Sequence, residues 1–366
     1  MKVRLPSGAR FLFATQHNHL PESYGGEEIN THALCHALGR QGISCALLCT
    51  LHRAGGFSLR RRLAMKLTRR AFTVDGGLGY PVMRRWNAVR GAAVAAARFR
   101  PRLVIAQGEE WPQLARVFLD LGIPVLAYAH ALDEVFDEPE LLRRGDFGIV
   151  VNSAFLASRF PAERRPRPIP PLVEPDRYRV APQRRVATFL NPQLGKGLDV
   201  AIRLVAARPD VPFEFVLSRH APPADWRKVG FDPGRFANLT VTGPFRDMRP
   251  VYRRSRLVVV PSRWLETWGR VVTEAQLSGI PVLASSRGAL PDTVGAGGIC
   301  LDPDDPPGDW EAAFAALWDD ADTYARCCAA AGAHAARRDI GPGAVLGAFL
   351  DVTGALLARG GGPTAP

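Results

Sequence analysis

Short apolar runs alternate with stretches of helical apolar periodicity along most of the chain. The runs that predict β-strands are Arg10–Thr15, Ile43–Cys49, Arg102–Ala106, Pro124–Ala129, Phe147–Val151, Arg185–Leu190, Phe213–Leu217, Leu239–Thr242, Leu257–Val260 and Ile280–Ala284. The periodic stretches predict helices after Gly26, Ser153, Lys196 and Gly269, and over Trp111–Leu121, Asp309–Ala336 and Val345–Leu357. Strands that alternate with helices in this way predict an α/β protein with parallel sheets.

The length of 366 residues suits two domains, each large enough for its own core. The proline-rich stretch Pro161–Pro182 predicts the linker between them. We therefore expect a first domain over residues 1–171 and a second over 172–342. The glycine-rich tail 359–366 is expected to be disordered.

The stretch Leu257–Gly298 reads as strand, loop, helix and strand, which is the βαβ unit of a parallel sheet. Glu266 falls in the loop, and Glu274 lies about five residues into the helix that starts near Gly269. A helix N-terminus favours phosphate, and carboxylates accept hydrogen bonds from sugar hydroxyls. The unit thus has the layout that a nucleotide sugar requires. The alternative is an ordinary βαβ unit with two solvated acids.

The spacing Glu266–x7–Glu274 and the later Ser278–Val282 resemble the signature of the family 4-type retaining glycosyltransferases (glycosyl transferases group 1) of the GT-B fold. The resemblance implies that Glu274 binds the ribose of the donor nucleotide. It also implies that Glu266 and the backbone after it, Thr267 and Trp268, hold the donor sugar.

Lys196-Gly197 resembles the KG motif of the same family, in which the Lys neutralises donor phosphate. The family usually has an Arg five residues before that Lys, and this chain has Asn191 there. Arg270 or Arg263 is then expected to supply the missing positive charge. The alternative for Lys196 is a solvated surface lysine.

Three weaker matches accompany these motifs. Gly25-Gly26 before a helix resembles the glycine-rich first loop that faces the donor diphosphate, and Gly243 begins a loop that resembles the one beside the nucleotide base. His130, directly after a predicted strand, matches a histidine that the family places near the donor sugar. The alternatives are a plain turn for the glycine pair and a loop histidine without a ligand for His130.

The resemblance implies two facing Rossmann-like domains, with the nucleotide sugar mainly on the second and the acceptor mainly on the first. The final helix, 343–358, is then expected to cross back onto the first domain. The reaction implied is sugar transfer with retention from a UDP- or GDP-sugar to a hydroxyl of a glycan, lipid or small metabolite. No convincing nucleophile is present, which fits a front-face mechanism in which Lys196, the helix start at Gly269 and the Gly25-Gly26 loop stabilise the departing diphosphate.

No metal is expected in this reaction. Asp302 and Asp304 formally make a D-x-D triplet, but the prolines around them predict a turn. The six cysteines lack zinc-site spacing and are expected to be buried free thiols. His17 and His19 are expected to be loop residues rather than ligands.

The net charge of +12 favours anionic binding partners, such as nucleotides, anionic lipids or nucleic acid. Residues 53–102 hold thirteen Lys or Arg against one acid, Asp75. Within them, 58–72 alternate basic and apolar residues, so a helix there would lie on an anionic membrane or grip an anionic acceptor. The alternative is a solvated Arg-rich face. No RNA-recognition motif is present, so no nucleic acid partner is expected.

The chain shows no secretion signal and no long uninterrupted apolar run, so we expect a cytoplasmic protein, peripheral at the inner membrane surface if 53–102 contact lipid. Two other readings of the whole remain open. One is a different GT-B enzyme, a nucleotide-sugar epimerase or a glycan phosphorylase. The other is a non-enzymatic polyanion-binding protein that uses residues 53–102.

Overall fold

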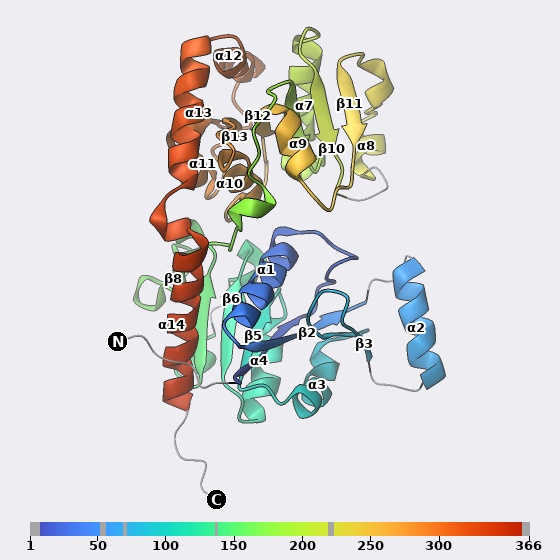
Figure 1. The fold of residues 1–366 in the computed structure, drawn as a ribbon, viewed down its shortest axis with the longest axis vertical. Helices are drawn as coiled ribbons and strands as arrows, with labels where there is room; N and C mark the ends of the chain where they lie inside the picture. The colour runs from blue at the N-terminus through green and yellow to red at the C-terminus, as the bar shows by residue number, and fades with distance from the viewer. Residues whose placement is uncertain (1–7, 52–55, 69–71, 136–137, 219–222, 361–366) are drawn as a thin grey trace, which may run out of the picture. The chain divides into compact units, whose positions relative to one another are not determined.

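The structure is a computed structural model that describes residues 8–51, 56–68, 72–135, 138–218 and 223–360. The chain forms two compact units (Figure 1). The first is Met1–Leu172 together with Pro342–Pro366, and the second is Val173–Gly341. The boundaries expected from the sequence, 171/172 and 342/343, lie beside these.

Within the described residues, the first unit holds an eight-stranded sheet. Its strands, in spatial order, are β3 (Thr73–Asp75), β4 (Val82–Arg85), β2 (Ser44–Thr50), β1 (Arg10–Thr15), β5 (Leu103–Gln107), β6 (Val125–Ala129), β7 (Phe147–Val151) and β8 (Arg167–Pro168). All neighbours pair in parallel except β3 and β4. Chain order reverses direction at β1, which is the switch point where α/β sheets carry ligands.

Helices cover both faces of this sheet, and both faces are apolar because the strands are buried on both sides. The helices of the unit are α1 (Gly26–Arg40), α2 (Gly56–Thr68), η1 (Val89–Gly91), α3 (Ala92–Phe99), α4 (Trp111–Asp120), η2 (Leu132–Glu134), α5 (Pro139–Leu142), α6 (Ala154–Ala157), η3 (Ala162–Arg164) and α14 (Pro342–Gly360). One apolar cluster joins the sheet to α1 and α14, and the other joins it to α3 and α4.

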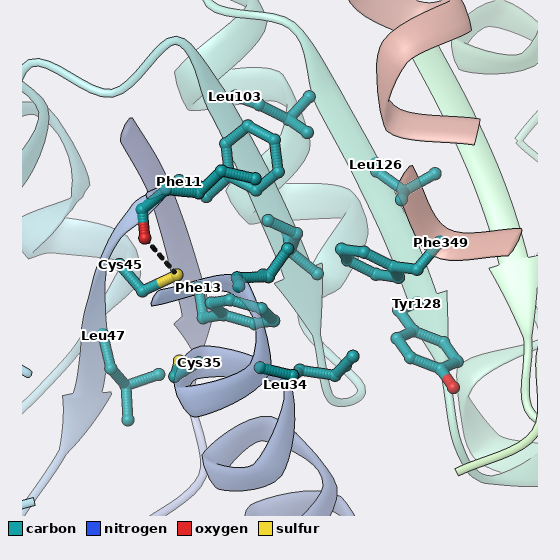
Figure 2. Close-up of a cluster of buried hydrophobic side chains, with 14 of the residues drawn as sticks. Phe11, Phe13, Leu34, Cys35, Cys45, Leu47, Leu103, Leu126, Tyr128 and Phe349 are labelled. Carbon is teal, nitrogen blue, oxygen red and sulfur yellow. Dashed lines mark hydrogen bonds between the residues drawn. The ribbon is translucent and has the colours of Figure 1, made fainter. Parts of the chain in front are cut away.

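Helix α14 belongs to the first unit, although it comes last in the chain. Figure 2 shows Phe349 of this helix beside Leu126 and Tyr128 of β6. The rings of Phe349 and Tyr128 have centroids 6.2 Å apart, and Phe349 is fully buried. Burying a side chain of this kind contributes about 1.5–3 kcal/mol, which holds the end of the chain on the first unit.

Helix α14 is long and apolar enough to span a membrane by length and composition alone. The core helices of globular proteins also meet these two criteria. Its residues Val345, Phe349 and Leu356 lie in the first core. The tail expected to be disordered begins at the last turn of α14, and its residues 361–366 lie outside the described residues.

Two stretches of the first unit are more structured than the sequence indicated. The basic region 53–102 contributes two strands and α3, and its Arg84 is fully buried with an ion pair to Asp75 at 2.8 Å. The predicted linker Pro161–Pro182 contains the boundary between the two units, which falls between Leu172 and Val173, but its part up to Leu172 is packed against the first unit. Its strand β8 pairs with β7, and Ile169 and Leu172 lie in the first core.

Within the described residues, the second unit holds a six-stranded parallel sheet. Its spatial order is β11 (Leu239–Thr242), β10 (Phe213–Val216), β9 (Val186–Leu190), β12 (Ser255–Val260), β13 (Val282–Ser285) and β14 (Gly298–Leu301). Strands β9 and β12 are neighbours, so the loops that follow them leave the sheet side by side.

The helices of the second unit also lie on both faces of its sheet. They are η4 (Pro175–Arg177), η5 (Leu194–Lys196), α7 (Leu198–Ala207), α8 (Asp225–Lys228), η6 (Pro233–Arg235), α9 (Arg249–Arg254), α10 (Arg270–Gln276), α11 (Leu290–Val294), η7 (Gly295–Gly297), α12 (Pro307–Trp318), α13 (Ala321–Ala335) and η8 (Arg338–Ile340). One apolar cluster contains α7 and α12, and the other contains α10 and α11. The helix expected over Asp309–Ala336 is two helices, and Asp320 caps the second.

Candidate functional site

The candidate site of the second unit lies beyond the carboxyl ends of β9 and β12. Lys196 ends η5 after β9, and Glu266 lies in the loop after β12. Their side chains meet, with 2.6 Å between Lys196 Nζ and Glu266 Oε1. The two residues stand seventy positions apart in sequence, and the parallel pairing of β9 and β12 brings them together.

The loop that carries Glu266 is fixed on both sides. Ser262 Oγ donates to Glu266 Oε1 at 2.8 Å, and Ala289 N donates to the Glu266 carbonyl at 2.7 Å. Glu266 also forms a parallel bridge with Gly288. Gly288 has φ +71°, and a Cβ there would stand 2.1 Å from the Glu266 carbonyl oxygen, so only glycine fits. Glu266 is therefore held in place by its backbone.

Trp264 also contacts the side chain of Lys196. Its ring centroid lies 4.8 Å from Lys196 Nζ, which is a cation–π contact. Gly195 makes room for this indole, since a Cβ there would come within 2.1 Å of it. The backbone N–H groups of Arg263 and Trp264 both donate to the Gly195 carbonyl, at 3.0 and 3.1 Å. The sequence did not single out Trp264 or Gly195.

Glu274 is buried inside the second unit rather than exposed at its edge. Tyr252 Oη donates to its Oε2 at 2.8 Å, and Arg270 Nε lies 2.9 Å from its Oε1. Arg270 also donates to Tyr178 Oη at 2.9 Å. Burial raises the pKa of Glu274, and the charge of Arg270 opposes that rise. Both oxygens of Glu274 thus have partners within the unit, and its ribose role stays a prediction.

The expected phosphate contact of Arg270 has the same difficulty, because its guanidinium is engaged with Glu274 and Tyr178. Helix α10 begins after Gly269, which has φ +81°. A Cβ on Gly269 would come within 2.5 Å of Leu290 Cδ2. The helix has only seven residues, so its N-terminal field is that of about two turns. The case for a phosphate site therefore rests on Lys196.

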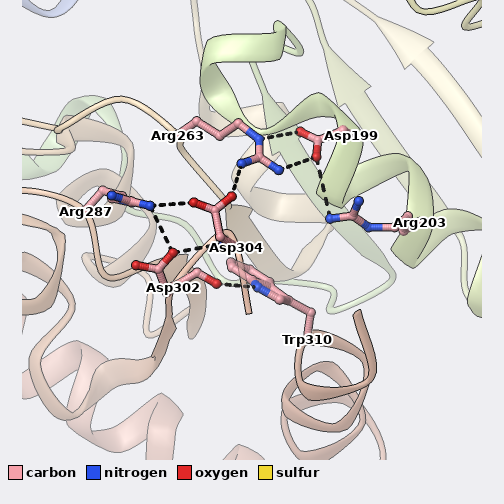
Figure 3. Close-up of polar contacts among 7 residues, drawn as sticks. All are labelled: Asp199, Arg203, Arg263, Arg287, Asp302, Asp304 and Trp310. Carbon is pink, nitrogen blue, oxygen red and sulfur yellow. Dashed lines mark hydrogen bonds and ion pairs between the residues drawn. The ribbon is translucent and has the colours of Figure 1, made fainter. Parts of the chain in front are cut away.

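Arg263, the other arginine considered for phosphate, belongs to a surface network (Figure 3). Its guanidinium contacts Asp199 at 2.6 Å and Asp304 at 2.5 Å. Asp302 and Asp304 in turn both contact Arg287, at 3.0 and 2.8 Å. The D-x-D triplet is thus a turn, as the sequence indicated, and the structure adds that its acids pair with Arg263 and Arg287. No group of three or more His, Cys, Asp or Glu that could hold a metal occurs among the described residues.

Asn191 takes a left-handed backbone conformation, with φ +57°, which asparagine tolerates better than most residues. Its Oδ1 accepts from Gln193 Nε2 at 2.6 Å and from Ser218 Oγ at 2.8 Å. Gly243, after β11, has φ +92°, and a Cβ there would stand 2.7 Å from the Leu217 carbonyl. Both positions are set by local backbone geometry.

The two residues after Glu266 lie in the same short loop. Thr267 is half-buried. Trp268 Nε1 donates to Thr273 Oγ1 at 3.1 Å, and the Trp268 carbonyl accepts from Thr293 Oγ1 at 2.6 Å. These bonds tie the loop to α10 and α11, so the backbone that is expected to face the donor sugar is rigid.

His130 of the first unit is buried at the end of β6. Its Nε2 lies 3.0 Å from Gln107 Nε2, and its backbone N–H donates to Glu134 Oε2 at 2.9 Å. Thr31 Oγ1 donates to Gln107 Oε1, which leaves the amide of Gln107 as the donor to His130. The ring of Tyr128 packs against the imidazole in a tilted arrangement, with ring centroids 4.1 Å apart. The environment fixes the ring as an acceptor at Nε2.

Gly25 caps α1 in extended conformation, and the space that its Cβ would take is filled by the Glu28 carboxylate, 2.4 Å away. Gly26 has open space around it. Gly25 therefore leaves room for the Glu28 carboxylate inside the unit. The expected diphosphate contact of this pair stays a prediction.

Sequence reasoning missed a polar cluster at the switch point of the first sheet. His17 Nδ1 lies 3.4 Å from Glu27 Oε2, and Thr15 Oγ1 donates to Glu27 Oε1 at 3.2 Å. The hydrogen bond to Glu27 raises the pKa of His17 to about 9. Burial and then the charge of Glu27 raise the pKa of Glu134 well above its ordinary value. His17 lies two residues after the end of β1, and this position was the available signal.

His19 is a buried structural residue, with its Nε2 2.9 Å from Tyr80 Oη. Burial lowers its pKa to about 3. All six cysteines are free thiols, four of them buried.

Known proteins match this chain in sequence over part of it and in fold over nearly all of it. Residues 194–320, which include Lys196, Glu266 and Glu274, match the family described as Glycosyl transferases group 1. The D-inositol 3-phosphate glycosyltransferase of Corynebacterium kroppenstedtii is 41% identical over 98 residues, which are 26% of this chain and 21% of that protein.

This chain matches only part of each such relative. The matched residues make up 21%, 23% and 34% of the length of three D-inositol 3-phosphate glycosyltransferases. Two solved structures cover the whole fold. Sucrose-phosphate synthase from Thermosynechococcus elongatus aligns with a TM-score of 0.72 and 16% identity, over 94% of this chain and 98% of its own. Anabaena HepE, solved with UDP and glucose, aligns with a TM-score of 0.71 and 17% identity, over 93% and 98%. The fold is GT-B, with two Rossmann-like units, as the sequence indicated.

Proposed function

We propose that this chain is a retaining glycosyltransferase that moves a sugar from a nucleoside diphosphate donor to a hydroxyl acceptor. The observation that carries the proposal is the contact of Lys196 with Glu266 beyond the ends of two neighbouring parallel strands. An ammonium group suits a diphosphate, and a fixed carboxylate suits sugar hydroxyls. The family match of residues 194–320 supports the same activity.

The incoming diphosphate exchanges for Glu266 at Lys196. Glu266 keeps its position during this exchange, because its backbone is bridged to Gly288 and its carboxylate accepts from Ser262. Its freed oxygen then accepts a hydroxyl of the donor sugar. Lys196 moves from a carboxylate to a phosphate, which are both anions, so little net charge is desolvated in the exchange.

The acceptor hydroxyl attacks the anomeric carbon on the face from which the diphosphate departs. The new carbon–oxygen bond forms as the bond to the phosphate oxygen breaks, and the hydroxyl proton passes to that phosphate oxygen. The configuration at carbon is retained. Lys196 offsets the charge that develops on the diphosphate, which is the main contribution the residues of this unit supply.

The proposed reaction is metal-independent, because the acids of the D-x-D triplet are engaged by Arg263 and Arg287. We propose UDP as the first donor base to test, since HepE was solved with UDP, and GDP as the second. The acceptor is a hydroxyl of a glycan, lipid or small metabolite. Peripheral contact of residues 53–102 with an anionic membrane belongs to the same proposal.

A thermal-shift titration with UDP, GDP, ADP and their sugar conjugates tests the donor site. A ligand at about 100 times its Kd stabilises the folded protein by about 2.7 kcal/mol, so one series is expected to raise Tm with concentration. Lys196→Met removes a charge-assisted contact of about 1.5–3 kcal/mol and is expected to weaken binding about 10- to 100-fold. Lys228→Met, at an exposed lysine of α8, is the matched control and is expected to bind normally.

Products distinguish the related enzymes. Conversion of the donor alone would indicate an epimerase, and dependence on inorganic phosphate would indicate a phosphorylase. Proton NMR of the anomeric proton of the product, compared with that of the donor, tests retention. Equal binding by Lys196→Met and the wild type, or no response to any nucleotide, would overturn the proposed site.

A further inference from the structure

Helix α2 presents a stripe of leucines to solvent. Leu59, Leu63 and Leu67 follow one another at intervals of four residues and therefore lie along one face of the helix. These residues are 65%, 56% and 74% exposed. An apolar stripe with one leucine per helical turn is energetically unfavourable in water, and the folding of the first unit leaves this stripe exposed.

The opposite face attaches α2 to the first unit. Ser58 and Met65 are buried there, and Ser58 Oγ donates to the Glu22 carboxylate. The ring of Phe57 lies 5.0 Å from the guanidinium of the buried Arg84. The helix lies beyond the β3 edge of the sheet, set off from the other helices of the unit (Figure 1). The leucines consequently face away from the protein.

Basic residues flank the stripe on both sides. At about 100° per residue, Arg60 lies about 60° to one side of Leu63 and Lys66 about 60° to the other. Both are exposed, and α2 contains no acid. Arg62 lies 4.1 Å from the ring of Trp86, which is itself 50% exposed next to the helix. The surface is therefore apolar along its centre, cationic along its rims, and bordered by an indole.

We propose that the α2 face, formed by Leu59, Leu63, Leu67, Arg60, Lys66 and Trp86, docks on an anionic lipid bilayer. The helix lies in the plane of the interface, with its leucines at the acyl boundary and its basic groups among the lipid phosphates. Tryptophan favours this depth because one end of the indole is apolar and the other is polar. The inference narrows the membrane contact of the proposed function to one helix face.

Charge decides against the other occupants of this face. A second copy of α2 would set Arg60 and Lys66 against the same cations, which repel. Nucleic acid would meet the cations but leave the three leucines uncovered. An anionic bilayer satisfies both the charges and the apolar stripe.

Flotation of the full chain with vesicles tests the inference. We expect binding to phosphatidylcholine vesicles that contain phosphatidylglycerol, little binding to phosphatidylcholine alone, and weakening as salt rises. Leu63→Glu is expected to lower binding at least tenfold, because it removes apolar contact and adds repulsion. Leu121→Glu, at an exposed leucine after α4, makes the same chemical change elsewhere and is expected to bind as the wild type does.

A second pair of variants tests the charged rim. Lys66→Ala is expected to lower binding about fivefold, since each basic group near an anionic surface contributes about that factor. Lys228→Ala, on α8 of the second unit, removes the same charge and is expected to leave binding unchanged. All four variants are at exposed positions, and circular dichroism melting checks that each is folded.

Three results would overturn the inference. The first is equal binding to neutral and anionic vesicles, and the second is equal binding by Leu63→Glu and Leu121→Glu. The third is no flotation at about 1 mM lipid, a concentration well above that at which one acyl chain gives marginal binding. A dimer in sedimentation equilibrium that Leu63→Glu abolishes, with no flotation, would assign the face to a second copy. The nucleotide titration on Leu63→Glu reports the donor site separately, so failure of either proposal is distinguishable from failure of the other.

Discussion

Glu274→Ala is expected to destabilise the second unit by about 3–5 kcal/mol, quite apart from any effect on donor binding. The side chains of Arg270 and Glu274 are 9% and 8% exposed, and 2.9 Å separates Arg270 Nε from Glu274 Oε1. Removal of the carboxylate leaves a buried guanidinium charge without its acid, and leaves Tyr252 Oη without its acceptor. Loss of one member of a buried ion pair costs about 3–5 kcal/mol.

Urea unfolding followed by tryptophan fluorescence measures this cost. The second unit holds most of the tryptophans, namely Trp226, Trp264, Trp268, Trp310 and Trp318. The fluorescence transition therefore reports chiefly on that unit. The double variant Arg270→Met with Glu274→Leu is expected to cost about 1–3 kcal/mol, less than Glu274→Ala, because apolar residues of similar size replace a buried ion pair at little cost while Tyr252 Oη still lacks its acceptor.

The reasoning is wrong if Glu274→Ala costs less than about 1 kcal/mol, or if the two single substitutions add up in the double variant, since additivity means that the residues are not coupled. The result also governs how the ribose prediction is tested. Donor binding by Glu274→Ala is informative only at a temperature where the variant is folded. Glu274→Gln, which keeps an acceptor for Tyr252, is the better variant for that measurement.

Three further outcomes are expected. Gly288→Ala brings a Cβ within 2.1 Å of a backbone carbonyl at φ +71°, so nucleotide affinity in the thermal-shift titration should fall at least tenfold, whereas Gly308→Ala, with open space, should not change it. The pKa of His17 is about 9 when folded against 6.5 ordinarily, so its contact with Glu27 stabilises fully below about pH 6.5 and is lost as pH rises through 9. His17→Gln should remove that slope from pH-dependent melting, about 1 kcal/mol after allowing for exposure. Asn191→Arg should tighten nucleoside diphosphate binding in calorimetry if its loop reaches the phosphate, and an unchanged Kd would show that it does not.

The local pattern of apolar residues predicted most strands well. It did not predict strands whose formation depends on pairing with neighbouring strands. β1, β7 and β11 run over the residues that their apolar runs predicted. The same reasoning missed β3 and β4, because short strands within a cationic stretch lack a clear alternation of apolar and polar positions.

The site shows the same limit. Lys196 and Glu266 were expected at one site from motif resemblance, and the order of strands in the sheet brings them into contact. Arg263 and Arg270 were expected at phosphate because both lie near the motif. The carboxylate partners of Arg263 come from α7 and the β14–α12 turn, and no local pattern connects them to this arginine. Glu274, the partner of Arg270, lies four residues further along the same helix α10, and this i, i+4 spacing was the available local signal for that pair.

The pairing of these cations decides which one can meet a diphosphate. Arg270 is committed in the buried interior with Glu274, and opening that contact would cost several kcal/mol. Arg263 spans two carboxylates from different elements. The contact of Lys196 with the single carboxylate of Glu266 is more open than that of Arg270 with Glu274, with side chains 24% and 15% exposed, and partly exposed pairs contribute only about 1 kcal/mol or less. A dianionic ligand can therefore displace Glu266 from Lys196 at small cost, and the same step releases the carboxylate that the sugar hydroxyls need.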